Sequence, residues 1–563
     1  MHFDPSYLPY SSMRYPVYAR NGMVASSSPQ ASAAGLAILQ KGGNAVDAAV
    51  AAATALTVVE PTSNGIGSDA FALVWIEREQ KLYGLNASGW APANISIEKV
   101  LKVGAGYHNA TQSSRPSIGA QAGLRETPNA SMPMFGWIPT TVPGAPSAWA
   151  ELVTRFGALS LAEVVKPAVK YAQEGYPVSA NLARMWKRAF EKYRTLYSAP
   201  EFEEWFRVFA PEGHAPEAGE IVHFPDHADT LKLIGTSNAE AFYRGELASR
   251  IVEDSDAFGG FFSKEDFETY RASWVEPISI DYRGYTVAEI PPNGQGIVAL
   301  MALNILNKFD LKERESAQAY HLQWEAMKLA FADGLAYVTD PASMCCSYRD
   351  FLQADYGTLR AQEIDVLGHA KLYSPRTPPS SGTVYLCTAD AQGNMVSYIQ
   401  SNYMGFGSGI VVRGTGISLQ NRGADFSLDP LHPNCLAPRK KTYHTIIPGF
   451  LLQDGRALGP FGVMGGYMQP QGHVQVVMNL IDFGLNPQQA LDAPRWQWVG
   501  GLKFLVERGF RADILTALAG RGHDIEVSED STPFGRGQII LRLPNGTLIG
   551  GSEGRTDSSI ACW

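Results

Sequence analysis

The feature that most constrains the fold is a run of three strand–turn–strand patterns that begins at Thr383. TVYLCTAD and MVSYIQSN flank the turn AQGN, and two similar units follow, GIVVR-GTG-ISLQN and TIIPGFLL-QDGR-ALGPFGVMGG. Apolar runs separated by glycine-containing turns predict antiparallel hairpins. The preceding two thirds of the chain has mostly helical patterns, so the sequence predicts a layered α+β architecture without internal repeats.

An alanine-rich helix is predicted close to the N-terminus. Asn44 is suited to cap it, with Asp47 at the third helical position, and small apolar residues recur on one face as far as Thr57. A helix with so small a surface suits close packing inside a core. It leads through a glycine-rich turn into an apolar strand over residues 70–75. Further helices are expected in APSAWAELVTRF, SLAEVVKPAVKYAQEG, SAQAYHLQWEAMKLAFADGLAYV, HVQVVMNLIDF and ADILTALAGRG.

Composition excludes several classes of protein. Of the 563 residues, 45% are hydrophobic and 18% charged, which is typical of a folded globular chain, and a net charge of −9 disfavours nucleic-acid binding. Five cysteines, including adjacent Cys345 and Cys346, indicate reduced thiols and no disulfide scaffold. The first 22 residues lack the apolar core of a signal peptide, and no run is long enough to cross a bilayer. We therefore expect a soluble, cytoplasmic protein with no membrane or nucleic-acid partner.

Several generic motifs fail on their spacing or context. The histidines form no HExxH or Cys/His zinc pattern, so no metal site is expected. GFGSG at 405–409 lacks the GK[ST] of a phosphate loop and is interpreted as a tight turn. Gly550, Ser552 and Gly554 match G-x-S-x-G, but no histidine follows. Cys387, inside an apolar strand, is interpreted as packing rather than as a thiol nucleophile paired with His444.

Thr383 is the strongest candidate for chemistry. It opens the first hairpin directly after YSPRTPPSSG, an exposed connector rich in proline and serine that ends in Gly382. Cleavage between Gly382 and Thr383 would give the threonine a free α-amino group, whose reference pKa is about 7.7–8.0. That amine could remove the proton from its own hydroxyl, which is one way to activate a nucleophile without histidine.

The residues resemble the γ-glutamyltranspeptidase family of N-terminal-nucleophile hydrolases over nearly the whole chain. Matching blocks include GGNAVDAAVAAATALTVVEPTSNGIGSDAF, VPGAPSAW, WVEPISIDYRGYTVAEIPPNGQG, GTVYLCTADAQGN and VMGGYMQPQG. The resemblance implies a four-layer αββα sandwich and a precursor that cuts itself before a threonine. The resulting fragments would be residues 1–382, mostly helical and wrapping the core, and the catalytic 383–563. No cofactor is implied.

The resemblance also assigns roles to individual residues. The family's nucleophile falls on Thr383, and its second active-site hydroxyl falls on Ser401 where the family has threonine. The paired glycines whose N–H groups form an oxyanion hole fall on Gly465 and Gly466, and glycine permits the required close approach. The aspartate that holds the donor α-amino group falls on Asp425. The alternative is that Asp425 has only a structural role, as a turn residue before Phe426.

Five positions depart from the family pattern in the donor pocket. Ser88 stands where the family has the arginine that binds the donor α-carboxylate, and a hydroxyl does not replace a guanidinium. Tyr403 and Arg422 replace an asparagine and a glutamine near the donor amine, while His444 and Thr445 replace a serine pair. In addition, residues 427–443 are too few to hold the lid loop of lidded members.

These departures predict an altered donor pocket. A cation at Arg422 suits a carboxylate better than an ammonium group, so we expect des-amino dicarboxylic acyl groups, as in the cephalosporin (glutaryl) acylase branch of the family. The expected enzyme is a self-processing amidohydrolase or acyltransferase acting on a small amide, built from its own two fragments, with higher oligomers left open. One alternative is a glutathione hydrolase or γ-glutamyl transpeptidase proper. Another is an uncut, non-catalytic binding or scaffold protein.

Overall fold

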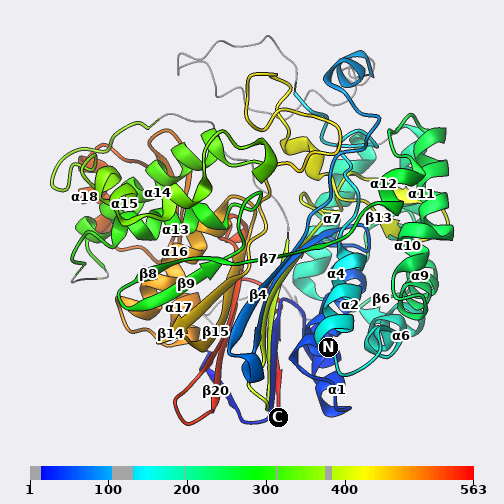
Figure 1. Ribbon diagram of the computed structural model, residues 1–563, viewed down its shortest axis with the longest axis horizontal. Coiled ribbons are helices and arrows are strands. Elements are labelled where there is room, and N and C mark those ends of the chain that lie inside the picture. The colour runs from blue at the N-terminus through cyan, green and yellow to red at the C-terminus, as the bar shows by residue number, and fades with distance from the viewer. Residues whose placement is uncertain (1–13, 104–130, 197, 312, 314, 374–382) are drawn as a thin grey trace.

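Two seven-stranded sheets stacked face to face form the centre of the molecule (Figure 1). The computed structural model describes residues 14–103, 131–196, 198–311, 313, 315–373 and 383–563. The first sheet has the strand order β1 (Val17–Ala19), β20 (Leu548–Ser552), β19 (Arg536–Arg542), β15 (Arg456–Met464), β14 (Gly449–Gln453), β9 (Tyr285–Glu289) and β8 (Ile278–Tyr282). The second has the order β21 (Ser559–Cys562), β2 (Gly22–Ser26), β10 (Val384–Asp390), β11 (Met395–Ser401), β3 (Asp69–Ile76), β4 (Lys81–Ala87) and β7 (Ser273–Val275).

Helices cover the outer face of each sheet, which completes the expected αββα sandwich. On the second sheet α1 (Pro29–Gln40), α2 (Ala45–Val59) and α4 (Ala145–Phe156) pack directly against the strands. Outside them lie α5 (Leu161–Val164), α6 (Lys166–Glu174), α7 (Ala180–Leu196), α8 (Glu203–Phe209), α9 (Pro225–Thr236), α10 (Glu240–Arg244), α11 (Glu246–Ala257) and α12 (Lys264–Glu268). On the first sheet α13 (Gly296–Leu306), α16 (Met468–Ile481) and α17 (Pro487–Asp492) pack directly against the strands, and α14 (Ala317–Tyr337), α15 (Ala354–Ala361) and α18 (Ala512–Gly520) lie outside them.

Smaller sheets lie at the periphery. They pair β12 (Val411–Val412) with β13 (Ile417–Ser418), β5 (Tyr176–Pro177) with β6 (Ile221–Val222), and β16 (Trp496–Gly500) with β17 (Lys503–Glu507) and β18 (Asp524–Ser528). The second predicted hairpin is therefore only two residues long on each side. Within the described residues, no helix is both long and apolar enough to cross a membrane.

The predicted alanine-rich helix is the buried centre of the helical layer on the second sheet. Every residue of α2 is buried, and the Asn44 side chain accepts hydrogen bonds from the backbone N–H groups of Val46 and Asp47 at 2.9 and 3.1 Å. The Asp47 carboxylate in turn accepts from Asn44 N at 2.9 Å, which completes the capping box. The small side chains let the helix lie directly on β10 and β11, so this part of the sequence analysis is confirmed.

Apolar packing between the two sheets places the end of β15 close to the start of β10. Apolar side chains from both sheets, including Phe71, Tyr385 and Phe450, fill the space between them. A Cβ at Gly462 of β15 would lie 2.5 Å from the Tyr385 ring of β10, so the two strands cross in close contact there. The Arg536 guanidinium, beside Met464 in the ladder, approaches Glu60 at 3.6 Å, and Glu60 also accepts from Ser27 after β2. The end of β15 and the start of β10 therefore share one end of the sandwich.

Candidate active site

Thr383 and Ser401 lie side by side at this end of the second sheet. Val384 pairs with Gln400 in the β10–β11 ladder, so the residues just beyond them are adjacent. The Thr383 Oγ1 and Ser401 Oγ atoms are 3.1 Å apart, and both side chains are fully buried. The Ser401 Oγ also accepts the backbone N–H of Tyr403 at 2.8 Å. Gly382 and the rest of the connector, residues 374–382, lie outside the described residues.

A buried carboxyl–imidazole pair lies on the other side of Ser401. Asp69 is the ladder partner of Ser401, and its Oδ2 lies 3.0 Å from the His444 Nε2. The His444 Nδ1 accepts the N–H of Ile446 at 3.3 Å, so Nε2 carries the proton and donates it to Asp69. Burial, reinforced by Arg422 and Lys441, holds the pKa of His444 well below its usual value, so the ring is neutral. Burial raises the pKa of Asp69 to about 7, although Arg422 opposes this.

Arg422 is a buried cation that contacts two of the other positions that differ from the family pattern, Tyr403 and Thr445. Its side chain is 1% exposed, its guanidinium lies 4.2 Å from the centroid of the Tyr403 ring, and its Nη1 donates to the Thr445 Oγ1 at 2.7 Å. Nη1 also lies 3.6 Å from Asp425 Oδ2. Among the described residues, Nε and Nη2 have no hydrogen-bond acceptor. Because a buried guanidinium donor without an acceptor costs free energy, these two donors mark a place for an anionic group.

Asp425 is already engaged by neighbouring side chains. Its Oδ1 accepts from the Tyr403 hydroxyl at 2.6 Å, and the Tyr467 hydroxyl lies 3.5 Å from the same oxygen. With the Arg422 ion pair, this carboxylate has two hydroxyl donors and a cation around it. A substrate ammonium group would have to share it with Arg422.

Ser88 belongs to a hydrogen-bond network of amides that reaches the Lys441 ammonium. Its Oγ donates to Asn86 Oδ1 at 2.7 Å and accepts from Asn293 Nδ2 at 3.2 Å. The Lys441 Nζ donates to the same Asn86 oxygen at 3.5 Å, and Asn293 Nδ2 also donates to the Thr442 carbonyl at 2.8 Å. Ser88 is fully buried, so this corner of the site offers amides, a hydroxyl and one ammonium group where the family pattern offers a guanidinium.

Gly465 and Gly466 form the link between β15 and the N-terminus of α16. Their φ angles are 140° and 60°, in the region that favours glycine, and a Cβ on Gly465 would lie 3.1 Å from the Gly535 Cα. The Gly465 carbonyl accepts the N–H of Met468 at 3.0 Å. Because a peptide N–H points opposite to its C=O, the Gly466 N–H points away from the helix body. A helix N-terminus with such N–H groups favours negative charge.

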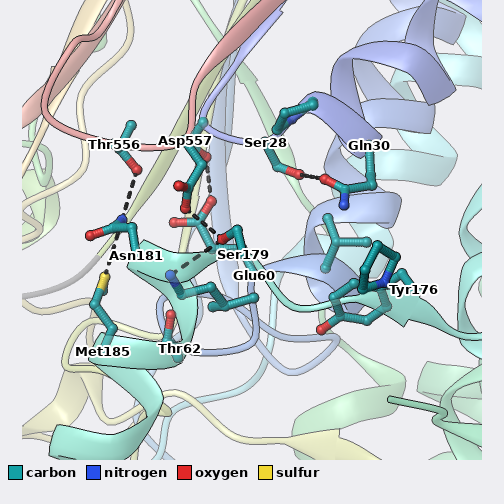
Figure 2. A pocket seen from close by; sticks show the side chains of 15 residues that line it. Ser28, Gln30, Glu60, Thr62, Tyr176, Ser179, Asn181, Met185, Thr556 and Asp557 are labelled. Atoms are coloured by element: carbon teal, nitrogen blue, oxygen red, sulfur yellow. Dashed lines mark hydrogen bonds between the residues drawn. The ribbon is translucent and has the colours of Figure 1, made fainter. Parts of the chain in front are cut away.

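A pocket lies apart from these groups, at the N-terminus of α1 (Figure 2). Ser28, Glu60, Tyr176 and Asp557 line it, and Figure 2 shows Ser179 bonded to Asp557, with Oγ to Oδ2 at 2.7 Å. Neither Thr383 nor Arg422 is among its lining residues. The Thr383 side chain is itself fully buried.

One group of side chains in the described part of the chain has metal-ligand spacing. His321, Glu325 and His523 are buried, with ligand atoms within 4.8 Å of one another, although their spacing in the sequence matches no metal motif. However, the Lys328 ammonium lies 2.5 Å from Glu325 and already neutralises it, and His321 Nδ1 is 2.9 Å from His523 Nε2. The cluster is thus a buried ion-pair and imidazole network between α14 and the residue before β18.

The sequence predicts one donor pocket from Ser88, Tyr403, Arg422, His444 and Thr445. The structure joins Tyr403 and Arg422 to Asp425 and Thr445 to Arg422, whereas His444 pairs with Asp69 and Ser88 with Asn86 and Asn293. Sequence reasoning missed Asp69, although the residue lies in the block SNGIGSDAF, because its partner His444 is 375 positions away. It also missed Gln295 in the turn PPNGQG, which was interpreted only as punctuation.

The αββα sandwich with a threonine at the head of a central strand has the architecture of the N-terminal-nucleophile hydrolases. The chain belongs to the gamma-glutamyltranspeptidase family, whose model matches residues 31–563. It is 37% identical to the glutathione hydrolase-like YwrD proenzyme of Bacillus subtilis (97% of this chain, 99% of that protein). It is 33% identical to the oxamate amidohydrolase proenzyme of Klebsiella pneumoniae (96% and 98%). The crystal structure of a cephalosporin acylase from Bacillus halodurans superposes with a TM-score of 0.92 at 55% identity, covering 100% of this chain and 99% of that one.

Proposed function

We propose that this chain is a self-processing amidohydrolase that removes dicarboxylic, glutaryl-type acyl groups from amines. Residues 1–382 and 383–563 would be the two fragments of the mature enzyme, with cleavage between Gly382 and Thr383. The names of the relatives, two of which are proenzymes and one of which is an acylase, support a processed acyl-transferring enzyme. We assign it to the cytoplasm, where its five free cysteines would stay reduced.

In the proposed mechanism the free α-amine of Thr383 removes the proton from its own Oγ1, and Oγ1 attacks the acyl carbon of the amide. Ser401, 3.1 Å away, orients the hydroxyl. The N–H groups of Gly465 and Gly466 stabilise the oxyanion that forms. The protonated amine then gives its proton to the leaving amine as the C–N bond breaks. Water, deprotonated by the same amine, releases the acid from the acyl–Thr383 ester.

The observation that carries the substrate class is the buried Arg422 with two donors lacking acceptors. A terminal carboxylate on the acyl group could accept both in a bidentate contact. At Ser88 an α-carboxylate would find the Lys441 ammonium, bound to Asn86, in place of a bidentate guanidinium, and Asp425 is already shared by Arg422 and Tyr403. Tyr403, His444 and Thr445 would form the remaining wall, with Thr445 and Tyr403 holding the guanidinium in place.

The second candidate keeps the chemistry and changes the donor to a γ-glutamyl compound. The presence of Asp425 favours it, because a carboxylate is the group that would bind a donor ammonium. A non-catalytic scaffold is the third reading, and an uncut wild-type chain on denaturing electrophoresis would support it.

The test compares glutaryl and γ-glutamyl anilides on purified cleaved enzyme. We expect the glutaryl substrate to have at least a tenfold higher kcat/KM. Arg422→Met should lower that value by about 10- to 100-fold, as expected for a charge-assisted contact of about 1.5–3 kcal/mol, with little effect on the γ-glutamyl substrate. Arg456→Met, at an exposed position on β15, is the matched control. Equal or faster cleavage of the γ-glutamyl anilide would contradict the proposal.

A further inference from the structure

The turn PPNGQG, residues 291–296, connects β9 to α13 and has no role in the mechanism described so far. Its Gln295 is fully buried at the active-site end of the sandwich. The residue lies in the segment 1–382, whereas the groups that it contacts lie in 383–563. It therefore joins the two proposed fragments beside the nucleophile.

The Gln295 side chain bonds the walls of the site through both ends of its amide. Its Nε2 donates to the Gly466 carbonyl at 2.8 Å and to the Thr445 carbonyl at 2.6 Å. Its Oε1 accepts from the Tyr443 hydroxyl at 3.1 Å, and its backbone N–H donates to the His444 carbonyl at 2.9 Å. One amide thus ties the glycine pair to the segment before β14 that carries Thr445, the partner of Arg422.

The glycine pair needs such a restraint. Glycine permits the φ angles of 140° and 60° observed at Gly465 and Gly466, but it also permits rotation away from them. The Gly466 carbonyl accepts from Gln469 N inside α16 at 3.1 Å as well as from Gln295. The Gly466 N–H belongs to the preceding peptide, whose Gly465 carbonyl accepts from Met468 N at 3.0 Å. With the peptides on both sides of Gly466 held, rotation about the Gly466 backbone that would turn its N–H away from an oxyanion is opposed. Stabilising an oxyanion depends on donors that are already in position.

We infer that Gln295 is a positioning residue that clamps the Gly465–Gly466 oxyanion hole to the acyl pocket across the boundary between the fragments. The inference rests on the proposed function of Thr383 and the glycine pair. Because an oxyanion exists only in the transition state, loss of the clamp should lower kcat and leave KM nearly unchanged.

The experiment compares Gln295→Leu and Gln295→Glu with the same changes at Gln475. Gln475 is a buried glutamine on α16 whose Nε2 also bridges two carbonyls, those of Gln471 and Trp496, both at 3.0 Å. Rates on a glutaryl anilide are normalised to the cleaved fraction seen on denaturing electrophoresis. We expect Gln295→Leu to lower kcat about 10- to 100-fold with KM changed less than about twofold. The Gln475 variants should lose thermal stability but keep kcat.

Gln295→Glu has nearly the shape of glutamine and still accepts from Tyr443, so it provides the test if the leucine variant fails to fold. An ionised carboxylate repels the two carbonyls, whereas a protonated one donates to one of them. Burial raises the pKa of such a carboxyl. The ratio of variant to wild-type kcat should therefore rise as pH falls from 8 to 5.5.

The outcomes separate the two proposals. A wild-type chain that is neither cut nor hydrolytic overturns the proposed function itself. An active wild type together with a Gln295→Leu variant of unchanged kcat overturns the clamp, and so does a Gln295→Glu ratio that does not vary with pH. If Gln295→Leu lowers kcat no more than the same change at Gln475, Gln295 has only a packing role and the clamp is overturned.

Discussion

A single contact, between the Thr383 and Ser401 hydroxyls at 3.1 Å, sets the geometry of the proposed nucleophile. Neighbouring strands hold both residues, and Tyr403 N–H holds the Ser401 oxygen from the other side. The threonine hydroxyl thus meets a fixed partner rather than a mobile side chain. For a proposed nucleophile that must be activated by its own amine, this leaves only one rotation, about χ1, to be controlled.

Ser401→Ala tests that contact. Loss of one neutral hydrogen bond, worth about 1–1.5 kcal/mol, should lower kcat about tenfold, and Ser401→Thr should restore it. The control is Ser397→Ala on the same strand, whose hydroxyl bonds the Tyr385 hydroxyl at 2.8 Å instead. Initial rates on a glutaryl anilide measure both. Equal losses at 397 and 401 would show that the effect comes from packing of β11 and not from orientation of Thr383.

At the level of single residues, the sequence predicts which residues line the donor pocket, but it does not predict which side chains they contact. Arg422 was predicted to face a carboxylate, and the structure adds its stacking on Tyr403 and its bond to Thr445. Neither could be read from spacing, because side-chain geometry around a buried guanidinium depends on the tertiary fold. The pairing of Asp69 with His444 is hidden for the same reason.

At the level of helices and strands, the sequence predicts correctly those elements whose contacts join residues close together in the chain. The hairpin of β10 and β11, the pair β14 and β15 and the capped helix α2 are confirmed. Helix α16 starts at Met468, five residues before the apolar pattern begins at His473, because its first turns are buried against the site and are not amphipathic. The pairing of β10 with β2 was not predictable, since a contact across some 360 positions leaves no periodic signal in either strand.

Helix α9 carries a buried histidine that provides a test of packing. His227 lies among aromatic rings, with Phe209 and Phe224 centroids at 5.9 and 5.0 Å, and neither of its ring nitrogens has a hydrogen-bond partner among the described residues. Burial lowers the pKa of His227 to about 4. The native state therefore binds fewer protons than the unfolded chain, so this residue stabilises the fold above pH 6.5 and that contribution is lost as pH falls towards 4.

His227→Leu should remove this pH dependence. The shift corresponds to about 3 kcal/mol, so the thermal midpoint of the variant should exceed that of the wild type at pH 4.5 by about 2–3 °C more than it does at pH 7.5. Thermal melts at both pH values, with the exposed His369→Leu as control, measure the difference. A constant difference between the two pH values would mean that His227 is protonated in the native state.

For the whole molecule, the proposed fragments interleave. β10 and β11 from 383–563 lie between β2 and β3 from 1–382, and β14 pairs with β9 across the same boundary in the other sheet. The core between the sheets draws on both fragments. Cutting the chain between Gly382 and Thr383 would leave all these contacts in place.

We therefore expect the cut protein to behave as one body. Wild-type protein should give two bands on denaturing electrophoresis and yet elute at the same volume as uncut Thr383→Ala on native gel filtration. Urea should unfold both fragments in one transition, because neither retains a complete sheet alone. Separate elution of the fragments before loss of secondary structure would contradict this arrangement.

The interleaving has a consequence for biosynthesis. A fragment made alone would expose the unpaired edges that β2, β3, β10 and β11 now cover with one another, and open edges invite aggregation. Translation as one polypeptide avoids this, because the covalent tether delivers the partner strands before the nascent edges meet those of another molecule. A gene split at codon 383 would thus be expected to yield insoluble halves.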